Sequence, residues 1–496
     1  MTNNKQQATI LAIDQGTSST RAILFSETLE VLAIQQKKLQ LYYPHKGWVE
    51  QNPETIWQDT LEVCKQVLAD KVATVAAIGI TNQRETTILW ERNTGKPIYP
   101  AIVWQDRRTA IDCERLKTAG NEAMVTARTG LLFDPYFSAT KLAWLLDNVA
   151  DARARAERGE LAFGTVDSYL LWQLTGGKVH ATDVTNAART LLFNIVEQKW
   201  DAELLALFNI PDAVLPIVLD NAAEFGKTDT SLFGREIQIG GMAGDQHAAL
   251  IGQRCFRPGM VKSTYGTGCF ALMNIGATFR ASQHRLLTTP AYRLNGRTTY
   301  AIEGSIFIAG AAIQWLRDAL GFFQEAAASE ALALSVPDNN EVYFIPAFIG
   351  LGAPHWRPDA RGIISGLSGE TTKAHIVRAA LEAQAYQTLD LMTAIEADGQ
   401  HQADVIRIDG GLTANQFMCQ FLADMLNKPI EVPQTTEATA LGAAILAGLT
   451  AGVFASLEAT ERYWQRDKIY SPIMPKAERE RLYTGWKTAL QSLISI

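Results

Sequence analysis

The chain has 496 residues, with 45 basic and 52 acidic side chains and a formal net charge of -7. This mild acidity argues against a surface that coats nucleic acid or an anionic membrane. No stretch approaches the roughly 20 consecutive apolar residues of a membrane-spanning helix, so we expect no membrane span. At about 150 residues per domain, the length predicts more than one domain.

Five cysteines are scattered along the chain without a CxxC pair, so nothing in their spacing suggests zinc or a redox disulfide. The apolar stretch before Asp14 is too short for the core of a secretion signal. Isolated thiols suit a reducing compartment. We therefore expect a cytoplasmic protein.

Strand-like and helix-like segments alternate along the chain, which predicts an α/β fold. Strands at 8–14, 21–25 and 31–40 should form an antiparallel meander. This opening differs from the first strands of a Rossmann dinucleotide-binding fold. A helix capped by Asn52 is expected at 54–68. Later strands are expected near 72–80, 86–90, 237–241, 260–265, 269–274, 342–346 and 404–408, and later helices at 138–149, 309–320, 371–397, 414–426 and 438–449.

The order strand, Gly/Thr/Ser turn, strand occurs twice, at 10–25 and at 260–274. Two such hairpins can arise by chance in any α/β protein. The alternative is two related halves joined near residue 253, each opening with a hairpin that faces phosphate. Because no Pro/Gly/Ser-rich linker marks the join, we predict domains of 1–253 and 254–496 that pack closely around a cleft.

Several familiar phosphate and hydrolase motifs are missing. Gly226-Lys227-Thr228 resembles the end of a P-loop, but Asn221 stands where the leading glycine belongs. No GxGxxG follows a strand, and neither HExxH nor GxSxG occurs. Together these absences argue against P-loop, Rossmann, zincin and serine-hydrolase functions.

The octapeptide 14–21 contains the groups that a phosphate needs. Gly16 permits a tight turn whose backbone N–H groups can converge. Arg21 adds a positive charge, and Asp14, at the end of the strand, could hold a hydrated Mg²⁺. An ordinary polar hairpin turn is the alternative. The hydroxyl groups of the turn belong to Thr17, Ser18 and Ser19.

Four other places could contact a substrate. Asp245, between an apolar strand and a small-residue helix, could accept a proton from a hydroxyl or cap the helix. Gly310 could let backbone approach a ligand or let helices pack. The segment 409–415 could hold a nucleotide or simply start a helix. Arg84 and Glu85 could recognise neighbouring hydroxyls or form a surface ion pair.

Together these motifs resemble the FGGY carbohydrate kinase family over about residues 8–487. Segments 136–148 and 362–382 resemble its two signatures, and DQGTSSTR, ITNQRETT, AGDQ, TYGTGCF and ATALGAA match text of its members. The resemblance implies an α/β fold of two actin-like, ribonuclease-H-type domains that flank a deep catalytic cleft. It implies phosphorylation of glycerol by ATP with Mg²⁺, in glycerol catabolism, and a homodimer or homotetramer.

The resemblance also implies roles for the matching residues. Asp245 would be the general base, and Asp14 and Asp245 would be the carboxylates near Mg²⁺. The polyol would contact Arg84, Glu85, Trp104, Tyr136, Asp245, Gln246 and Phe270. ATP would contact Thr17, Ser18, Ser19, Arg21, Thr267, Gly310, Gln314, Gly411 and Asn415.

Two alternatives remain open. Another FGGY kinase could act on a pentulose or a similar polyol, although ITNQRETT, WQDRRT and DPYF favour glycerol. A catalytically silent glycerol sensor or an actin-like interaction protein belongs to a different class. Five residues that an active kinase of this family would need are all present, which argues against a catalytically silent protein. They are Asp14, Thr17, Arg84, Asp245 and Thr267.

Overall fold

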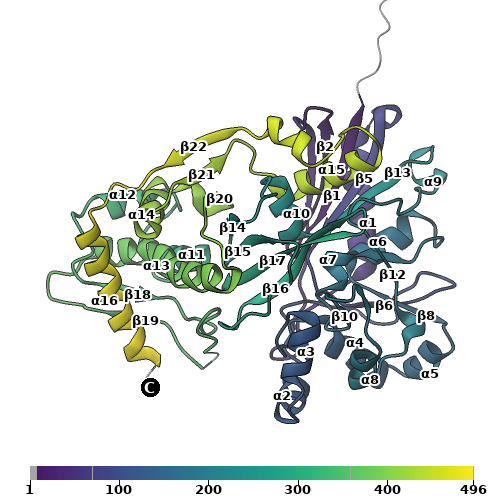
Figure 1. Ribbon diagram of the computed structural model, residues 1–496, viewed down its shortest axis with the longest axis horizontal. Helices are drawn as coiled ribbons and strands as arrows, with labels where there is room; N and C mark the ends of the chain where they lie inside the picture. The colour runs from purple at the N-terminus through teal and green to yellow at the C-terminus, as the bar shows by residue number, and fades with distance from the viewer. Residues whose placement is uncertain (1–7, 70, 358, 495–496) are drawn as a thin grey trace, which may run out of the picture.

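The computed structural model describes residues 8–69, 71–357 and 359–494. Residues 1–7, on which the expectation about a secretion signal partly depends, lie outside this range. The chain forms two halves, each built on a sheet (Figure 1). The first half runs from purple to teal in that view, and most of the second runs from green to yellow.

The first sheet has the strand order β13-β5-β1-β2-β3. β1 (Thr9–Gln15), β2 (Ser19–Ser26) and β3 (Val31–Lys38) form the predicted antiparallel meander. β5 (Val75–Asn82) and β13 (Gln238–Gly244) add parallel strands beside β1. The side chains of β1 are buried along its whole length, because helices and strands cover both faces of this sheet.

The second sheet has the order β16-β17-β15-β14-β20-β21-β22. Its β14 and β15 form an antiparallel hairpin, and β20 lies parallel to β14, as β5 does to β1. The two halves therefore open in the same way. The strands are β14 (Met260–Tyr265), β15 (Cys269–Gly276), β16 (Leu287–Leu294), β17 (Arg297–Ile306), β20 (Val405–Asp409), β21 (Ile430–Pro433) and β22 (Arg466–Tyr470).

Helices and shorter strands complete the halves. The helices are α1 (Pro53–Leu68), α2 (Ala110–Thr118), α3 (Glu122–Thr129), α4 (Ser138–Asn148), α5 (Ala152–Glu157), α6 (Val166–Leu174), α7 (Val184–Ala187), α8 (Ala202–Phe208), α9 (Thr230–Phe233), α10 (Asp245–Gly252), α11 (Gly310–Asp318), α12 (Ala328–Leu334), α13 (Lys373–Gly399), α14 (Gln416–Leu426), α15 (Ala438–Thr450) and α16 (Lys476–Ile494). The short strands are β4 (Glu50–Gln51), β6 (Ile88–Glu91), β7 (Ala101–Ile102), β8 (Leu161–Gly164), β9 (Ala181–Asp183), β10 (Phe193–Asn194), β11 (Lys199–Trp200), β12 (Ile217–Leu219), β18 (Tyr343–Ile345) and β19 (Ile363–Ser365).

Most predicted elements are confirmed, and two differences are informative. Asn52 caps α1 as expected, with its side chain accepting from the backbone N–H groups of Glu54 and Thr55. The strand expected at 72–80 begins with a 3₁₀ turn at 72–74, and only β5 is extended. The prediction omitted β16 and β17. Proline is atypical of a buried strand, and β16 contains Pro290. A charged residue is also atypical, and β17 contains Glu303.

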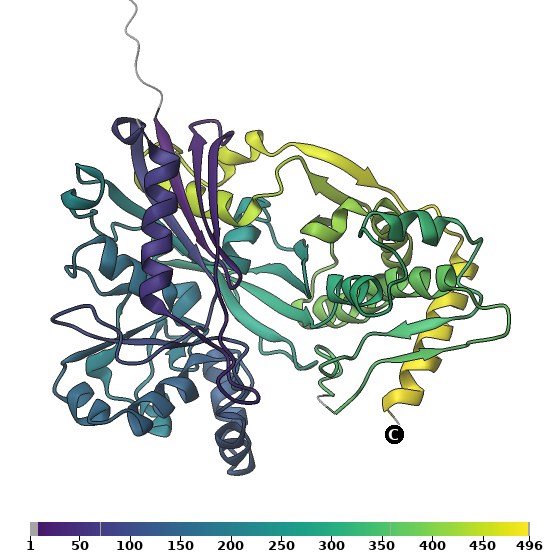
Figure 2. The ribbon, with the colours of Figure 1, turned by 180° about the vertical axis from the view of Figure 1, so that it is seen from behind.

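Helix α15 belongs to the second half of the sequence but packs on β1, β5 and β13 of the first sheet (Figures 1 and 2). It also crosses α10 at close range. A Cβ atom at Gly442 would lie 1.8 Å from the carbonyl oxygen of Ala248, and one at Gly252 would lie 1.8 Å from that of Ala438. Only glycine fits these two positions, so the crossing joins the halves tightly.

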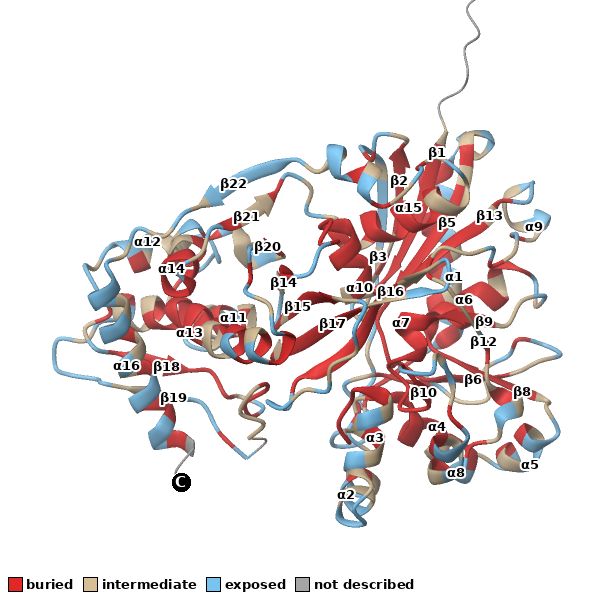
Figure 3. Cartoon of the chain, viewed as in Figure 1, coloured by how far each residue is buried: buried red, intermediate tan, exposed pale blue. Residues whose placement is uncertain are grey.

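The buried residues gather along the central strands of both sheets and at the α10–α15 crossing, which are mostly red in Figure 3, whereas the edge strands β3 and β22 are largely exposed. All five cysteines are buried and free. Across the described ranges, no helix combines the length and the apolar character needed to cross a membrane.

Candidate active site

The first predicted phosphate turn connects β1 to β2. The Gly16 N–H donates to the Ser19 carbonyl at 2.9 Å, which closes the turn. The N–H groups of Thr17 and Ser18 have no hydrogen-bond partner among the described residues. Side-chain amides hold the Gly16 and Thr17 carbonyls at 2.7 to 3.3 Å, and they belong to Gln15, Gln51 and Gln83. With its carbonyls engaged, the turn keeps free N–H donors that suit an anion.

Arg21 links this hairpin to the start of α15. Its guanidinium lies 2.5 Å from Asp14 Oδ2 and 2.7 Å from an oxygen of Glu437. Burial raises the pKa of Asp14; Arg21 opposes this rise, whereas the negative charges of Asp245 and Glu437 add to it. The two carboxylates predicted to lie near Mg²⁺, Asp14 and Asp245, are therefore close enough to repel each other.

Arg84 lies directly after β5 and is only 3% exposed, so the alternative of a surface ion pair is wrong. Its Nη1 and Nη2 atoms lie 2.6 and 3.1 Å from the two carboxylate oxygens of Glu303 on β17. Its Nε atom lies 3.1 Å from Asp245 Oδ1. A residue of the first half is thus held by a carboxylate of the second.

Glu85 and Arg189 complete a buried cluster of charges around this pair. Arg189 Nε donates to Glu85 Oε1 at 2.5 Å, and Arg189 Nη2 lies 3.2 Å from Glu303 Oε1. Burial raises the pKa of Glu303, but the charges of Arg189 and Arg84 outweigh burial and leave that pKa well below its ordinary value. Glu303 is therefore ionised, and the sequence prediction missed both it and Arg189.

Asp245 is the first residue of α10, and Gly244 occupies the N-cap position, so the helix-cap alternative for Asp245 is wrong. Asp245 Oδ1 accepts from the backbone N–H of Gln246 at 2.7 Å and forms an ion pair with Arg84 Nε. Its Oδ2 atom has no partner within the described part of the chain. The carboxylate is therefore oriented through one oxygen, and the other can meet a substrate.

Lys262 of β14 is a second buried charge that the sequence prediction missed. Its ammonium group donates to Gln246 Oε1, and its Nζ atom lies 3.4 Å from the carbonyl oxygen of Phe270. Burial lowers the pKa of Lys262, whereas the negative charges of Asp409 and Asp245 raise it. A charged side chain in an apolar strand is the one sequence signal that could have found it.

Trp104 connects the phosphate turn with the predicted polyol residues. Its indole N–H donates to Thr17 Oγ1 at 2.8 Å, and its ring meets that of Tyr136 edge-on at 5.5 Å. Tyr136 also lies 5.4 Å from the guanidinium carbon of Arg189. Phe270, the other predicted aromatic wall, is half-buried on β15.

The other predicted nucleotide residues lie in the second half, on the turn after β14, on α11 and in the segment 409–415. The N–H groups of Ala309 and Ala311 donate to the Thr267 carbonyl, which docks the start of α11 on that turn. A Cβ atom at Gly310 would lie 2.6 Å from the Gly266 carbonyl oxygen, so Gly310 lets α11 pack on the β14–β15 turn and not on another helix. Gly410 similarly lies against the backbone of Tyr265.

Two other residues of the nucleotide prediction differ in their surroundings. Gln314 is exposed one helical turn beyond Gly310 on α11. Asn415 is buried and caps α14 by accepting from the N–H of Met418, so the helix-start alternative for 409–415 is confirmed. Gly411 is exposed at the preceding turn. Contact of these residues with a nucleotide stays a prediction.

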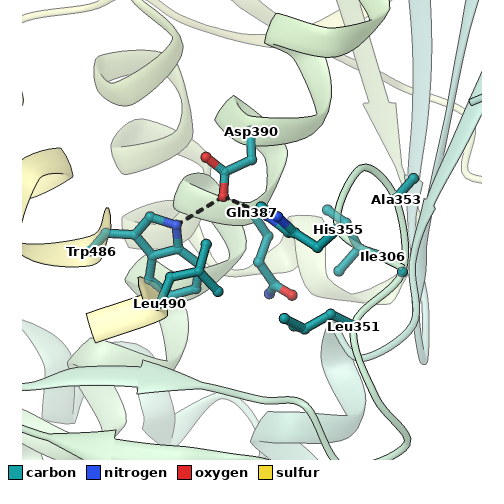
Figure 4. A pocket seen from close by; sticks show the side chains of 9 residues that line it. Ile306, Leu351, Ala353, His355, Gln387, Asp390, Trp486 and Leu490 are labelled. Atoms are coloured by element: carbon teal, nitrogen blue, oxygen red, sulfur yellow. Dashed lines mark hydrogen bonds and ion pairs between the residues drawn. The ribbon is translucent and has the colours of Figure 1, made fainter. Parts of the chain in front are cut away.

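Two cavities lie outside this group of residues. One in the second half has a volume of about 10 Å³, room for about one water molecule, and Figure 4 shows His355 and Trp486 converging there on Asp390. The other is a groove of about 510 Å³ lined by residues that include Gln51, which also holds the Thr17 carbonyl. The groove therefore lies next to Gln51, one of the side chains that hold the phosphate turn.

The chain is similar to known kinases over almost its whole length. The N-terminal domain of the FGGY family of carbohydrate kinases matches residues 9–252, and the C-terminal domain matches residues 261–451. The glycerol kinase of Nitrosomonas eutropha is 79% identical, with 98% of each chain covered. Glycerol kinase 1 of Pseudomonas aeruginosa is 56% identical and covers 98% of this chain and 99% of its own.

A solved structure supports the same relationship. The structure of Plasmodium falciparum glycerol kinase with ADP has a TM-score of 0.93 at 35% identity, with 98% of each chain covered. These neighbours and the two sheets confirm the predicted α/β fold of two actin-like domains. The enzyme prediction is confirmed as well, and the chain belongs to the FGGY family of carbohydrate kinases.

Proposed function

We propose that this protein transfers the γ-phosphoryl group of ATP to a terminal hydroxyl of glycerol and forms sn-glycerol 3-phosphate. The names of its relatives support glycerol as the acceptor, and ADP in the Plasmodium falciparum structure supports ATP as the donor. The observation that carries the proposal is the orientation of Asp245, with Oδ1 engaged by two donors and Oδ2 available.

Asp245 would act as the general base. A bond forms between the glycerol oxygen and the γ-phosphorus while the bond from that phosphorus to the bridging oxygen of ADP breaks. The proton of the attacking hydroxyl passes to Asp245 Oδ2, and ADP leaves with the electron pair of the broken bond. Arg84 and the Gln246 N–H fix the carboxylate, so little reorganisation is needed when the proton moves.

The two phosphate turns would neutralise charge on the transferring group. On the first turn, the donors are the free N–H groups of Thr17 and Ser18, the hydroxyls of Thr17, Ser18 and Ser19, and the guanidinium of Arg21. Thr267, on the second turn, would contribute a hydrogen-bond donor from the opposite half of the chain. Donors that are already in place stabilise developing charge without reorganising during the reaction. The remaining nucleotide contacts would come from Gly310, Gln314, Gly411 and Asn415.

Asp14 and Asp245 would hold a magnesium ion. Among the described residues, no group of three or more histidine, cysteine, aspartate or glutamate side chains could hold a metal. Mg²⁺ usually needs only one or two carboxylates, because waters and substrate phosphates complete its shell. A cation held by these two carboxylates would relieve their mutual repulsion. When bound, Mg²⁺ would neutralise charge on the phosphate oxygens.

The polyol would lie among the buried charges of the first half. Arg84, Glu85, Tyr136 and Gln246 supply donors and acceptors for neighbouring hydroxyls. Trp104 and Phe270 would cover the carbon atoms and exclude water from the transferring group. The burial of Arg84 and Glu85 supports this role, because buried polar groups that are meant for hydroxyls reject substrates that lack them.

An ADP-release assay with a panel of polyols and ketoses tests the proposal. Glycerol should give a higher kcat/KM than xylulose or ribulose. A preference for either ketose would favour another FGGY substrate, and absence of turnover with every acceptor would favour a sensor. The division near residue 253, the dimer or tetramer, the cytoplasmic location and the role in glycerol catabolism stay predictions.

A further inference from the structure

Two side chains predicted to bind the polyol are each held by a buried charge from the opposite half of the chain. Arg84 follows β5 of the first sheet, and its partner Glu303 lies on β17 of the second. Gln246 lies on α10, and its partner Lys262 lies on β14 of the second sheet. Glu303 is 1% exposed and Lys262 is 0% exposed. The contact of Glu303 with Arg84 is buried, and that of Lys262 with Gln246 is partly buried.

Lys262 determines which end of the Gln246 amide faces the site. An ammonium group can only donate hydrogen bonds, so the amide atom that it contacts must be the oxygen, Oε1. The amide nitrogen of Gln246 then points away from Lys262. That nitrogen can donate to a hydroxyl oxygen of the substrate, whereas a rotated amide would present an acceptor.

Glu303 fixes the plane of the Arg84 guanidinium. Its two oxygens engage both terminal nitrogens, an arrangement that constrains orientation as well as distance. The same plane directs Nε of Arg84 at Asp245 Oδ1. A guanidinium carries five N–H groups, and three of them serve these contacts, which leaves two for hydroxyls. Arg189 lies 3.2 Å from the same carboxylate and offsets its charge.

We propose that Glu303 and Lys262 are positioning residues for the acceptor, through which the second half orients Arg84 and Gln246 toward the hydroxyls of the polyol. This inference rests on the proposed function. It makes the acceptor site a joint product of both halves, although its predicted direct contacts lie mostly in the first. Glu303 and Lys262 act through their partners and do not themselves touch the substrate.

The test compares steady-state kinetics of the full-length wild type, Glu303→Gln and Lys262→Met with glycerol and ATP. Wild-type turnover of glycerol comes first, because its absence would contradict the proposed function and not this inference. We expect KM for glycerol to rise about 10- to 100-fold in each variant, as for loss of a charged hydrogen bond, while KM for ATP stays within about twofold. Equal changes in both constants, or none in either, would overturn the inference.

A conservative variant and a control separate positioning from general stability. Glu303→Asp keeps the charge and should recover part of the affinity for glycerol; should Glu303→Gln not fold, Glu303→Asp against wild type carries the comparison. Glu382→Gln breaks another buried pair, in which Arg378 Nε donates to Glu382 Oε1 at 2.8 Å. It should lower thermal stability without changing KM for glycerol; a rise in that KM equal to that of Glu303→Gln would contradict the inference.

A double-mutant cycle tests the route through Gln246. If Lys262 acts by orienting that amide, Lys262→Met should change KM for glycerol in the wild-type background but not in a Gln246→Met background. The same change in both backgrounds would show that Lys262 does not act through Gln246, and would overturn its part of the inference. Lys262→Met removes a costly buried charge with little change in shape, so folding should be preserved.

Discussion

Arg84 and Glu303 form a two-pronged ion pair, with nitrogen–oxygen distances of 2.6 and 3.1 Å, although 219 residues separate them in sequence. Both side chains are almost completely buried. Removing one partner from such a pair leaves an uncompensated charge and costs about 3–5 kcal/mol in typical cases. The pair therefore couples the geometry of the site to the stability of the contact between halves.

Asp245→Asn tests the general base. The amide cannot accept the hydroxyl proton, so kcat should fall about 10²- to 10⁴-fold, while the affinity for glycerol changes little. Stopped-time assays of ADP release and equilibrium glycerol binding measure the two quantities. Asp147→Asn, at an exposed ion pair with Arg153, serves as the control and should leave kcat unchanged. Near-normal kcat in Asp245→Asn would contradict the assignment.

Gly442→Ala tests the α10–α15 crossing. The added methyl group would lie 1.8 Å from the Ala248 carbonyl oxygen, so the helices must separate. Overpacking of this kind costs about 1–3 kcal/mol, and Tm should fall accordingly. Gly369→Ala, where an added Cβ has nothing within 4 Å, is the matched control. Equal Tm values for the two variants would show that the crossing is not tight.

Trp104→Phe tests the link between the phosphate turn and the aromatic wall. The variant keeps a ring but loses the hydrogen bond to Thr17 Oγ1. We expect KM for ATP to rise about 2- to 10-fold, the effect of one neutral hydrogen bond. Trp200→Phe loses an indole bond to the Pro216 carbonyl and should change no kinetic constant. An unchanged KM for ATP in Trp104→Phe would indicate that the turn holds its shape without the indole.

Asp183 predicts a specific dependence of stability on pH. Burial, and then the charge of Asp167, raise the pKa of Asp183 from 3.8 to about 7. The folded state therefore binds this proton more tightly than the unfolded state. The contribution of the protonated Asp183 carboxyl to the free energy of unfolding is therefore fully present below pH 3.8. It is lost as pH rises through about 7.

Asp183→Asn removes this titration. Chemical unfolding between pH 4 and pH 8 should show a flatter dependence of the unfolding free energy on pH in the variant than in wild type. The absolute stability should also fall, because Asp183 accepts from the Asn186 and Asn221 side chains at 2.7 Å each. Parallel curves for the two proteins would contradict the raised pKa.

Local sequence patterns predicted much of the secondary structure. Apolar runs bounded by turn residues marked β1, β14 and β20, and Asn52 marked the start of α1 correctly. These features depend on neighbours in the chain, so a short window contains their causes. The prediction missed β17 because burial of Glu303 is favourable only beside Arg84 and Arg189, which lie far away in sequence. It missed β16 because Pro290 is atypical of a buried strand.

The sequence by itself determined the family, the two opening hairpins and the residue types of the predicted site, because these are properties of motifs. Only the tertiary structure decided that Arg84 and Glu85 are buried, that Gly244 rather than Asp245 caps α10, and that α15 packs on the first sheet. It alone identified Glu303 and Lys262 as partners of Arg84 and Gln246. A buried charge is tolerated only when an opposite charge or a hydrogen-bond partner lies next to it in the folded protein. These partners are far away in sequence, so a local sequence pattern does not predict the contact.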